Sequence, residues 1–206
     1  MIKNQKSSGM HIARMPTLFE AMLDSLMTPS VAASALTKAA LVVFGSLLLA
    51  ASAQFKIPLY PVPVTGQTLV VLLIGMTYGL RLGTITMAAY LFEGLIGMPV
   101  FAGGAAGVAV LMGPTGGYLV GFLLAGVAMG YLAERGMGRT AFSTIVAMVI
   151  GNFVIYLCGV FWLVSFIGFG QAIAVGVLPF LFGDALKLAI AAGLMPLAWR
   201  AVNSLK

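Results

Sequence analysis

Charged and chemically reactive side chains are scarce in this chain, and each scarcity excludes a class of function. Only 8% of its 206 residues are charged, whereas soluble proteins average about 25%. The single cysteine, Cys158, cannot form an intramolecular disulfide or a cysteine-based zinc site. The single histidine, His11, lies in the N-terminal tail, so the apolar part of the chain has no histidine for a catalytic dyad or for most metal sites.

Sequence motifs that carry enzymatic chemistry are missing as well. The chain has no Gly-x-Ser-x-Gly elbow and no Gly-x-x-x-x-Gly-Lys-Ser/Thr loop for a nucleotide phosphate. Its basic residues are dispersed, without the basic stripe and interleaved aromatics of a nucleic-acid surface. We therefore expect no enzyme, no metal, no cofactor and no nucleic-acid partner, and ATP-driven work would require partner subunits.

Apolar residues are abundant: 61% of the chain is hydrophobic, in long runs separated by short polar turns. This composition predicts an all-α integral membrane protein in the lipid bilayer with six transmembrane helices. The predicted spans cover residues 34–55, 64–79, 82–97, 115–133, 141–169 and 172–199. Arg81 marks the turn between the second and third spans, and a glycine-rich loop joins the third and fourth spans.

The distribution of basic residues predicts the orientation of these spans. With six spans and a cytoplasmic N-terminus, both termini are cytoplasmic, and only Lys56 lies outside while Lys187 lies within a span. The basic residues then assigned to the cytoplasmic side are Lys3, Lys6, Arg14, Lys38, Arg81, Arg135, Arg139, Arg200 and Lys206. This asymmetry follows the positive-inside rule and favours six spans over five or seven.

Residues 1–33 form a polar and then amphipathic lead, which we assign to the cytoplasmic or interfacial side. Thr17 and Glu20 are spaced as a capping box, and Pro29 ends the helix that this box would begin. The pattern leaves two interpretations open, a short helix on the membrane surface and a disordered or loosely docked tail. A signal peptide ending at residues 51–53 is disfavoured because the apolar run is too long for one.

Two segments on the predicted outer side have unusual composition. Residues 56–63 contain three prolines, which exclude a continuous helix and predict a structured loop. Residues 98–107 and 113–118 are glycine-rich but apolar, and such backbone is tolerated near a membrane when it is buried in protein or lines a cavity. The glycine-rich segment of residues 98–118 is either a cap over a site or a long connection.

Polar side chains within the spans converge on the same outer half. Asp184 and Lys187 are three residues apart, so they share one face of a helix, and each costs about 2.5–3.5 kcal/mol in a bilayer centre unless it has a partner or a task. With Gln67, Asn152 and Thr115 they predict an outward-facing pocket for a small molecule. Structural alternatives stay open: an internal ion pair, an interhelical hydrogen bond from Asn152, and a helix cap by Gln67.

Four blocks of sequence, residues 57–69, 94–104, 113–122 and 184–187, resemble the BioY family of biotin-binding S components of energy-coupling factor (ECF) transporters. The resemblance implies a six-helix membrane domain over residues 34–206 that captures biotin with high affinity at the outer face. It also implies uptake across the bacterial cytoplasmic membrane with a transmembrane coupling subunit and two ATPase subunits, or self-association in a solitary protein. The alternatives are an S component for another vitamin and a structural membrane protein without a ligand.

The resemblance also names residues. It implies substrate binding by Asp184, Lys187, Asn152, Gln67, Phe101, Gly103, Gly104, Thr115 and Tyr118. Asp184 would accept hydrogen bonds from the two ureido N–H groups of biotin, and Lys187 would meet the carboxylate or the ureido carbonyl. Docking of the coupling subunit is expected on small residues of the first span, at Ser46 and Ala50 or alternatively at Ala35 and Ala39.

Overall fold

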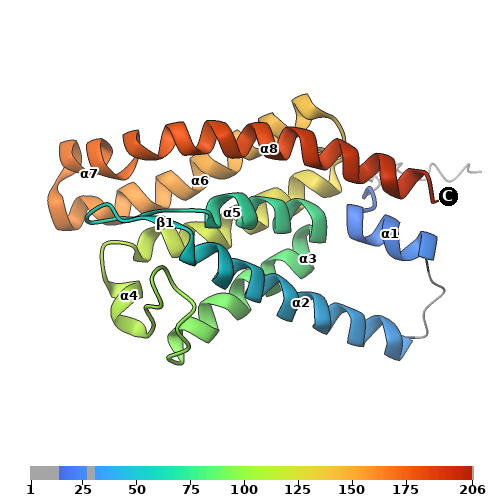
Figure 1. The fold of residues 1–206 in the computed structure, drawn as a ribbon, viewed down its shortest axis with the longest axis horizontal. Coiled ribbons are helices and arrows are strands. Elements are labelled where there is room, and N and C mark those ends of the chain that lie inside the picture. The colour runs from blue at the N-terminus through green and yellow to red at the C-terminus, as the bar shows by residue number, and fades with distance from the viewer. Residues whose placement is uncertain (1–13, 27–30, 206) are drawn as a thin grey trace, which may run out of the picture.

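The structure is a computed structural model that describes residues 14–26 and 31–205. The expected all-α class is confirmed, with one small hairpin of strands among the helices (Figure 1). The helices are α1 (Leu18–Leu26), α2 (Val31–Gln54), α3 (Gln67–Leu95), α4 (Val108–Met112), α5 (Gly116–Glu134), α6 (Ala141–Ile167), α7 (Phe169–Gly176) and α8 (Leu178–Asn203). The expectations that involve Lys3, Lys6, His11, Pro29 and Lys206 lie outside the described residues.

Five helical stretches in the described residues are long and apolar enough to cross a membrane. They are α2, α3, α5, α6 and the stretch formed by α7 and α8. The six-span prediction assigned two spans to what is here α3. Either half of α3 is shorter than the stretch of about 20 residues that a straight span needs. The count of six therefore stays a prediction.

Helix α3 is divided at Gly79, where φ is +81° and ψ is −176°. The two halves fold back on each other: a Cβ on Gly83 would lie only 3.2 Å from the Cα of Gly75, although the two residues are eight positions apart. The chain thus reverses at Gly79, just before the predicted turn at Arg81, because glycine alone adopts a positive φ without strain. The N–H of Leu80, which begins the second half, donates to Glu134 Oε1 at 3.1 Å.

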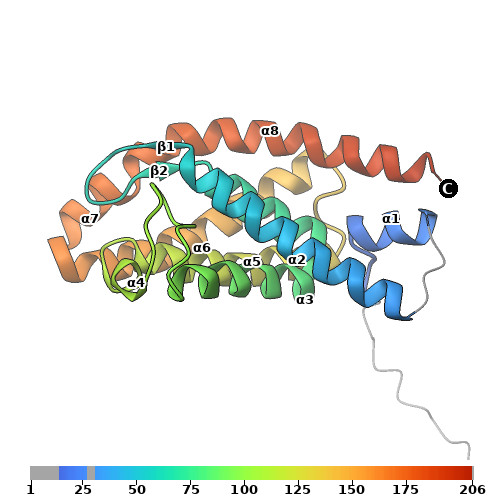
Figure 2. The same ribbon diagram turned by 60° about the horizontal axis from the view of Figure 1, so that its bottom comes forward.

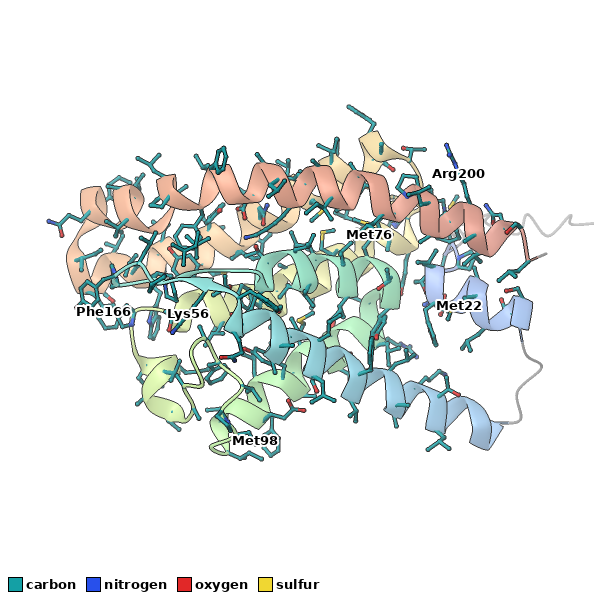
Figure 3. All side chains as sticks on the ribbon, in the orientation of Figure 1. Met22, Lys56, Met76, Met98, Phe166 and Arg200 are labelled. Carbon is teal, nitrogen blue, oxygen red and sulfur yellow. The ribbon has the colours of Figure 1, made fainter. Side chains whose placement is uncertain are left out.

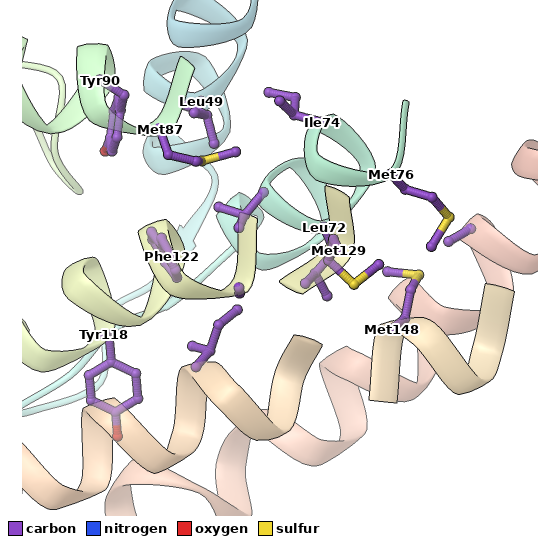
Figure 4. Packing of buried hydrophobic residues seen from close by; sticks show 14 of the residues in the cluster. Leu49, Leu72, Ile74, Met76, Met87, Tyr90, Tyr118, Phe122, Met129 and Met148 are labelled. Atoms are coloured by element: carbon purple, nitrogen blue, oxygen red, sulfur yellow. The ribbon is translucent and has the colours of Figure 1, made fainter. Parts of the chain in front are cut away.

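Helix α5 lies at the centre of the fold and is the most buried of the candidate spans. Its glycines permit close contact on both sides: a Cβ on Gly121 would lie 3.0 Å from Ile155 of α6, and one on Gly130 would lie 2.5 Å from Leu80 of α3. Figure 4 shows side chains from α3, α5 and α6 meeting in this core, with Met129 near Met148. Small residues at these positions let α5 approach its neighbours closely.

The predicted sixth span, residues 172–199, lies within the candidate span of residues 169–203, but that stretch is interrupted near its start. Helix α7 ends at Gly176, Val177 departs from helical geometry, and α8 begins at Leu178 with Pro179 in its first turn. Proline favours this position because the first helical N–H groups have no partner inside the helix. Helix α7 contacts both α6 and α8 (Figure 1).

Helix α1 packs against α3 and α8. The predicted capping box is confirmed, since the N–H of Thr17 donates to Glu20 Oε2 at 3.0 Å and the N–H of Glu20 donates to Thr17 Oγ1 at 3.3 Å. Phe19 is buried against Tyr78 with 6.0 Å between ring centroids. This burial shows that α1 is docked on the other helices.

The molecule has two chemically different ends. Helix α1 and the C-terminal end lie together, whereas strands β1 (Lys56–Ile57) and β2 (Val64–Thr65), helix α4 and helix α7 lie at the opposite end (Figures 1 and 2). The antiparallel pairing of β1 with β2 confirms a structured proline-rich loop. Figure 3 shows Arg200 at the end with α1, here called the basic end, and Lys56 at the other, the loop end.

Candidate functional site

A cavity of about 180 Å³ lies at the loop end, enclosed by segments from most of the chain. The segment that leads into α3 supplies Val62, Pro63 and Thr65, and the glycine-rich loop supplies Phe101, Ala102 and Ala105. The remaining lining residues come from the helices: Gln67, Thr68, Val110, Thr115, Tyr118, Leu119, Phe122, Ile155, Tyr156 and Phe180. Its walls are mainly apolar with a few hydroxyl and amide groups, which is typical of a small-molecule site.

Aromatic rings form one wall of the cavity. Tyr118 of α5 stacks on Phe180 of α8 with 6.1 Å between ring centroids, and Tyr156 of α6 meets Phe180 edge to face. The hydroxyl of Tyr118 donates to the carbonyl of Gly176 at 2.8 Å. Because a Cβ on Gly159 would overlap the ring of Tyr118, the absence of a side chain on α6 admits this tyrosine.

The side-chain amide of Gln67, which also lines the cavity, is held in place by hydrogen bonds. Its Nε2 donates to the Tyr90 hydroxyl at 2.6 Å, and that hydroxyl donates to the carbonyl of Val100 at 3.1 Å. Thr65 Oγ1 donates to Gln67 Oε1 at 3.3 Å. Since an amide nitrogen carries two hydrogens, Nε2 keeps one donor beyond its bond to Tyr90.

Asp184 and Lys187 form a buried ion pair one layer behind the cavity wall. Lys187 Nζ lies 3.1 Å from Asp184 Oδ1, and the side chains are 13% and 5% exposed, respectively. Lys187 Nζ also donates to Thr68 Oγ1 at 2.7 Å, and the Thr68 hydroxyl donates to Asp184 Oδ1 at 3.4 Å. Tyr156 donates its hydroxyl to Asp184 Oδ2.

This network determines which atoms face the cavity. The hydroxyl hydrogen of Tyr156 is used by Asp184, so the remaining lone pair on the Tyr156 oxygen is an acceptor at the wall. The hydroxyl hydrogen of Thr68 is likewise used, because it is donated to Asp184 Oδ1. A buried carboxylate and a buried ammonium thus act on the cavity through the two side chains that separate them from it.

The predicted site residues fall into three groups. Gln67, Phe101, Thr115 and Tyr118 line the cavity. Asp184 and Lys187 stand behind the wall, joined to each other as the ion-pair alternative expected.

Asn152, Gly103 and Gly104 do not line the cavity. Asn152 is 7% exposed and lies one helical turn before Tyr156 on α6, with no partner for Oδ1 among the described residues. The alternative of an interhelical hydrogen bond by Asn152 is therefore not fulfilled at its Oδ1. Gly103 and Gly104 have φ of +74° and +73°, so they shape the loop that carries Phe101.

The docking prediction for the first span does not fit the placement of Ser46. Ser46 is 1% exposed, and its Oγ donates to Glu93 Oε1 at 2.8 Å, because this face of α2 packs on α3. Ala50 is half-buried. The alternative pair, Ala35 and Ala39, lies exposed on α2.

Sequence reasoning missed Thr68, Tyr156 and Phe180. Tyr156 is four residues after Asn152 and therefore shares its helical face. This spacing could have identified Tyr156 as a candidate site residue. Phe180 carries no polar atom, and only the tertiary structure brings it to the cavity. Within the described residues, no group of three or more His, Cys, Asp or Glu side chains could hold a metal ion.

Fold and cavity together define a helical membrane protein with a small-molecule site near one end. The BioY family matches residues 23–204, and the chain belongs to this family. The probable biotin transporter BioY of Pyrococcus horikoshii is 40% identical over 144 residues, covering 70% of this chain and 85% of that protein. The biotin transporter BioY of Thermotoga maritima is 42% identical over 147 residues, with the same coverage.

A solved structure has the same fold. The S-component for biotin from an ECF-type ABC transporter matches with a TM-score of 0.73 and 23% identity, over 84% of this chain and 95% of that one.

Proposed function

We propose that the protein captures biotin at the loop end and serves as the S component of an ECF-type transporter for biotin uptake. Membership of the BioY family and the names of its relatives support this function. The observation that carries it is the apolar cavity with a buried Asp184–Lys187 pair directly behind its polar wall. A transporter of this family is not expected to be an enzyme.

The polar atoms of the cavity match the ureido ring of biotin. That ring presents two N–H donors and one carbonyl acceptor. The oxygen of Tyr156 offers a lone pair to a ureido N–H, and the second hydrogen on Gln67 Nε2 is a donor for the ureido carbonyl. The apolar sulfur ring would pack on Phe180 and Tyr118.

In this proposal Asp184 and Lys187 are positioning residues. Their charges hold the hydroxyls of Thr68 and Tyr156 in one orientation, so that neither oxygen has to reorganise when biotin enters. A preorganised site gains affinity because less conformational freedom is lost on binding. Asn152 would contribute its free Oδ1 only if its side chain turns toward the cavity.

The proposed topology has six spans over residues 34–206, with the break at Gly79 separating the second from the third, and residues 1–33 as a cytoplasmic lead. Arg135 and Arg139 lie in the turn after α5, and Arg139 donates to the carbonyl of Pro16 just before α1. Arg200 lies in the last turn of α8 at the same basic end (Figure 3). The positive-inside rule assigns this end to the cytoplasm of a bacterial cell. The loop end and its cavity would then open outward.

The proposed partners are a transmembrane coupling subunit and two ATPase subunits, since no nucleotide motif is present in the chain. The exposed Ala35 and Ala39 of α2 are the proposed docking position, in place of the buried Ser46. Self-association is the alternative for a solitary protein, and co-purification with or without the coupling subunits distinguishes the two.

Isothermal titration of purified protein with biotin tests the function directly. The expected result is saturable binding with one biotin per chain, and a thermal stabilisation that grows as RT ln(1 + [L]/Kd). Other vitamins serve as controls in the same panel. Preferential binding of another vitamin would replace biotin as the substrate, and no stabilisation by any vitamin would favour a structural membrane protein.

A further inference from the structure

A second hollow, of about 520 Å³, lies at the basic end, far along α8 from the biotin cavity. It is formed between the first turn of α6 and the last turns of α8. Arg139 and Thr140, the two residues before α6, line one side of it, and Trp199, Arg200 and Asn203 line it from α8. Nothing in the proposed biotin function uses these residues.

The hollow has positive charge without a counter-charge. Among the described residues, no Asp or Glu side chain lines it, and the salt bridges involve only Arg14 and Lys187 as cations. The side chain of Arg200 is exposed and makes no hydrogen bond within the described part of the chain, and Figure 3 shows it extending from α8 at this end. Two guanidinium groups beside one hollow therefore favour an anion there.

Buried donors around the hollow also lack acceptors. The guanidinium carbon of Arg139 lies 4.5 Å from the centroid of the Trp199 ring, and Arg139 donates to the carbonyl of Pro16 at 3.2 Å. Arg139 Nε and Trp199 Nε1 are buried without a hydrogen-bond partner in the described residues, and Trp199 is only 9% exposed. Buried N–H groups without acceptors are uncommon. Because both atoms are shielded from the open space, a ligand in the hollow would be bound by the exposed guanidinium of Arg200 and by the part of Arg139 that lines the hollow.

The start of α6 adds to the positive potential. The first N–H groups of an α-helix have no partner inside the helix. Thr140 caps this helix of 27 residues and satisfies one of these groups, since its Oγ1 accepts from the N–H of Ser143 at 3.2 Å. Helix N-termini carry a partial positive charge that favours phosphate and other anions. Here this end coincides with Arg139 and Arg200 at one hollow.

The other wall of the hollow is apolar and continues onto a lipid-facing surface. Pro196 and Leu197 of α8 line it, and Leu197 is 58% exposed. Leu194, one turn before, is 50% exposed. An apolar wall below two arginines matches an amphipathic ligand, with a phosphate at the basic end and acyl chains along α8.

We propose that this hollow binds the phosphate group of an anionic phospholipid from the membrane leaflet at the basic end. Arg200 and Arg139 would hold the phosphate together with the start of α6, and the acyl chains would lie on Leu194 and Leu197. The site is independent of the biotin cavity, so its test does not depend on biotin binding.

Native mass spectrometry of the full chain, released from detergent with phosphatidylglycerol or phosphatidylcholine, tests the site. We expect one preferentially retained phosphatidylglycerol and about fivefold weaker retention in Arg200→Gln, since one basic residue near an anionic surface contributes about that factor. Arg200 has no intramolecular side-chain partner among the described residues, so this variant is expected to fold. Arg135→Gln is the matched control because Arg135 stacks on Tyr131 at 4.6 Å, at the same end but outside the hollow.

Each other outcome contradicts the proposal in a defined way. Equal retention of phosphatidylcholine would show that the anionic headgroup is not recognised. An equal loss in Arg135→Gln would assign the effect to general surface charge. Displacement of phosphatidylglycerol by millimolar inorganic phosphate would identify a site for a free anion in place of a lipid.

Discussion

Substitutions at Asp184 and Lys187 can distinguish a role of this ion pair in helix packing from a role in biotin binding. Asp184→Leu alone would leave the ammonium of Lys187 buried, with the Thr68 hydroxyl as its remaining partner. Breaking a buried pair from one side costs about 3–5 kcal/mol of stability. For a chain of this size each kcal/mol lowers the melting temperature by about 2–4 °C, which a thermal unfolding scan in detergent resolves.

The double variant Asp184→Leu with Lys187→Met removes both charges, so no uncompensated ion is left. Its stability is expected to return close to that of the unmodified protein, since apolar replacement of a buried pair is often neutral. Biotin affinity should nevertheless stay at least tenfold lower, about 1.4 kcal/mol, because Tyr156 and Thr68 lose the carboxylate that orients them. Isothermal titration with biotin measures this difference.

Glu93→Gln is the matched control for removing a carboxylate. Glu93 lies on α3 and bonds Ser46 outside the cavity lining, so its loss should leave biotin affinity unchanged. If the double variant bound biotin as tightly as the unmodified protein, Asp184 and Lys187 would serve only to pack α8. The positioning role would then be refuted.

Three further substitutions follow from the same geometry. Tyr156→Phe removes the wall acceptor and leaves Asp184 with one fewer donor; we expect a loss in biotin affinity of about 1–1.5 kcal/mol by titration, and unchanged affinity would exclude this tyrosine as a ligand contact. Gly159→Ala pushes the Tyr118 ring from its place and should cost about 1–3 kcal/mol of stability in thermal unfolding together with weaker biotin binding, whereas normal binding would place the ring outside the site. Gly79→Ala introduces a Cβ 2.5 Å from Thr17 at a φ of +81° and should destabilise by about 1–2 kcal/mol with little change in biotin affinity, and equal stability would contradict the reversal at this residue.

Several predictions about single helices were confirmed, because they depend only on residues close together in the sequence. The capping box of Thr17 and Glu20 and the shared helical face of Asp184 and Lys187 both follow from spacing within one helix. The same locality explains why the helices predicted from residues 115 and 141 begin at Gly116 and Ala141.

Predictions that depended on which face of a helix meets its neighbour were less accurate. Ser46 was expected on a docking surface, but it bonds Glu93 because α2 turns this face to α3. The hydrophobic pattern of α2 could not reveal this, since lipid and protein interior are both apolar and leave no contrast along the helix. The break at Val177 was missed for a related reason, because α7 and α8 are both apolar.

The sequence alone determined the membrane class, the family, the proline-rich and glycine-rich segments, and the presence of a carboxylate and an ammonium on one helix. These properties reside in composition and short-range spacing. Only the tertiary structure decided that Asp184 and Lys187 stand behind Thr68 and Tyr156, so that their charges act on the cavity through hydroxyl groups. The physical reason is that α3, α6 and α8 meet at this point through packing between segments far apart in the chain, which no local pattern encodes.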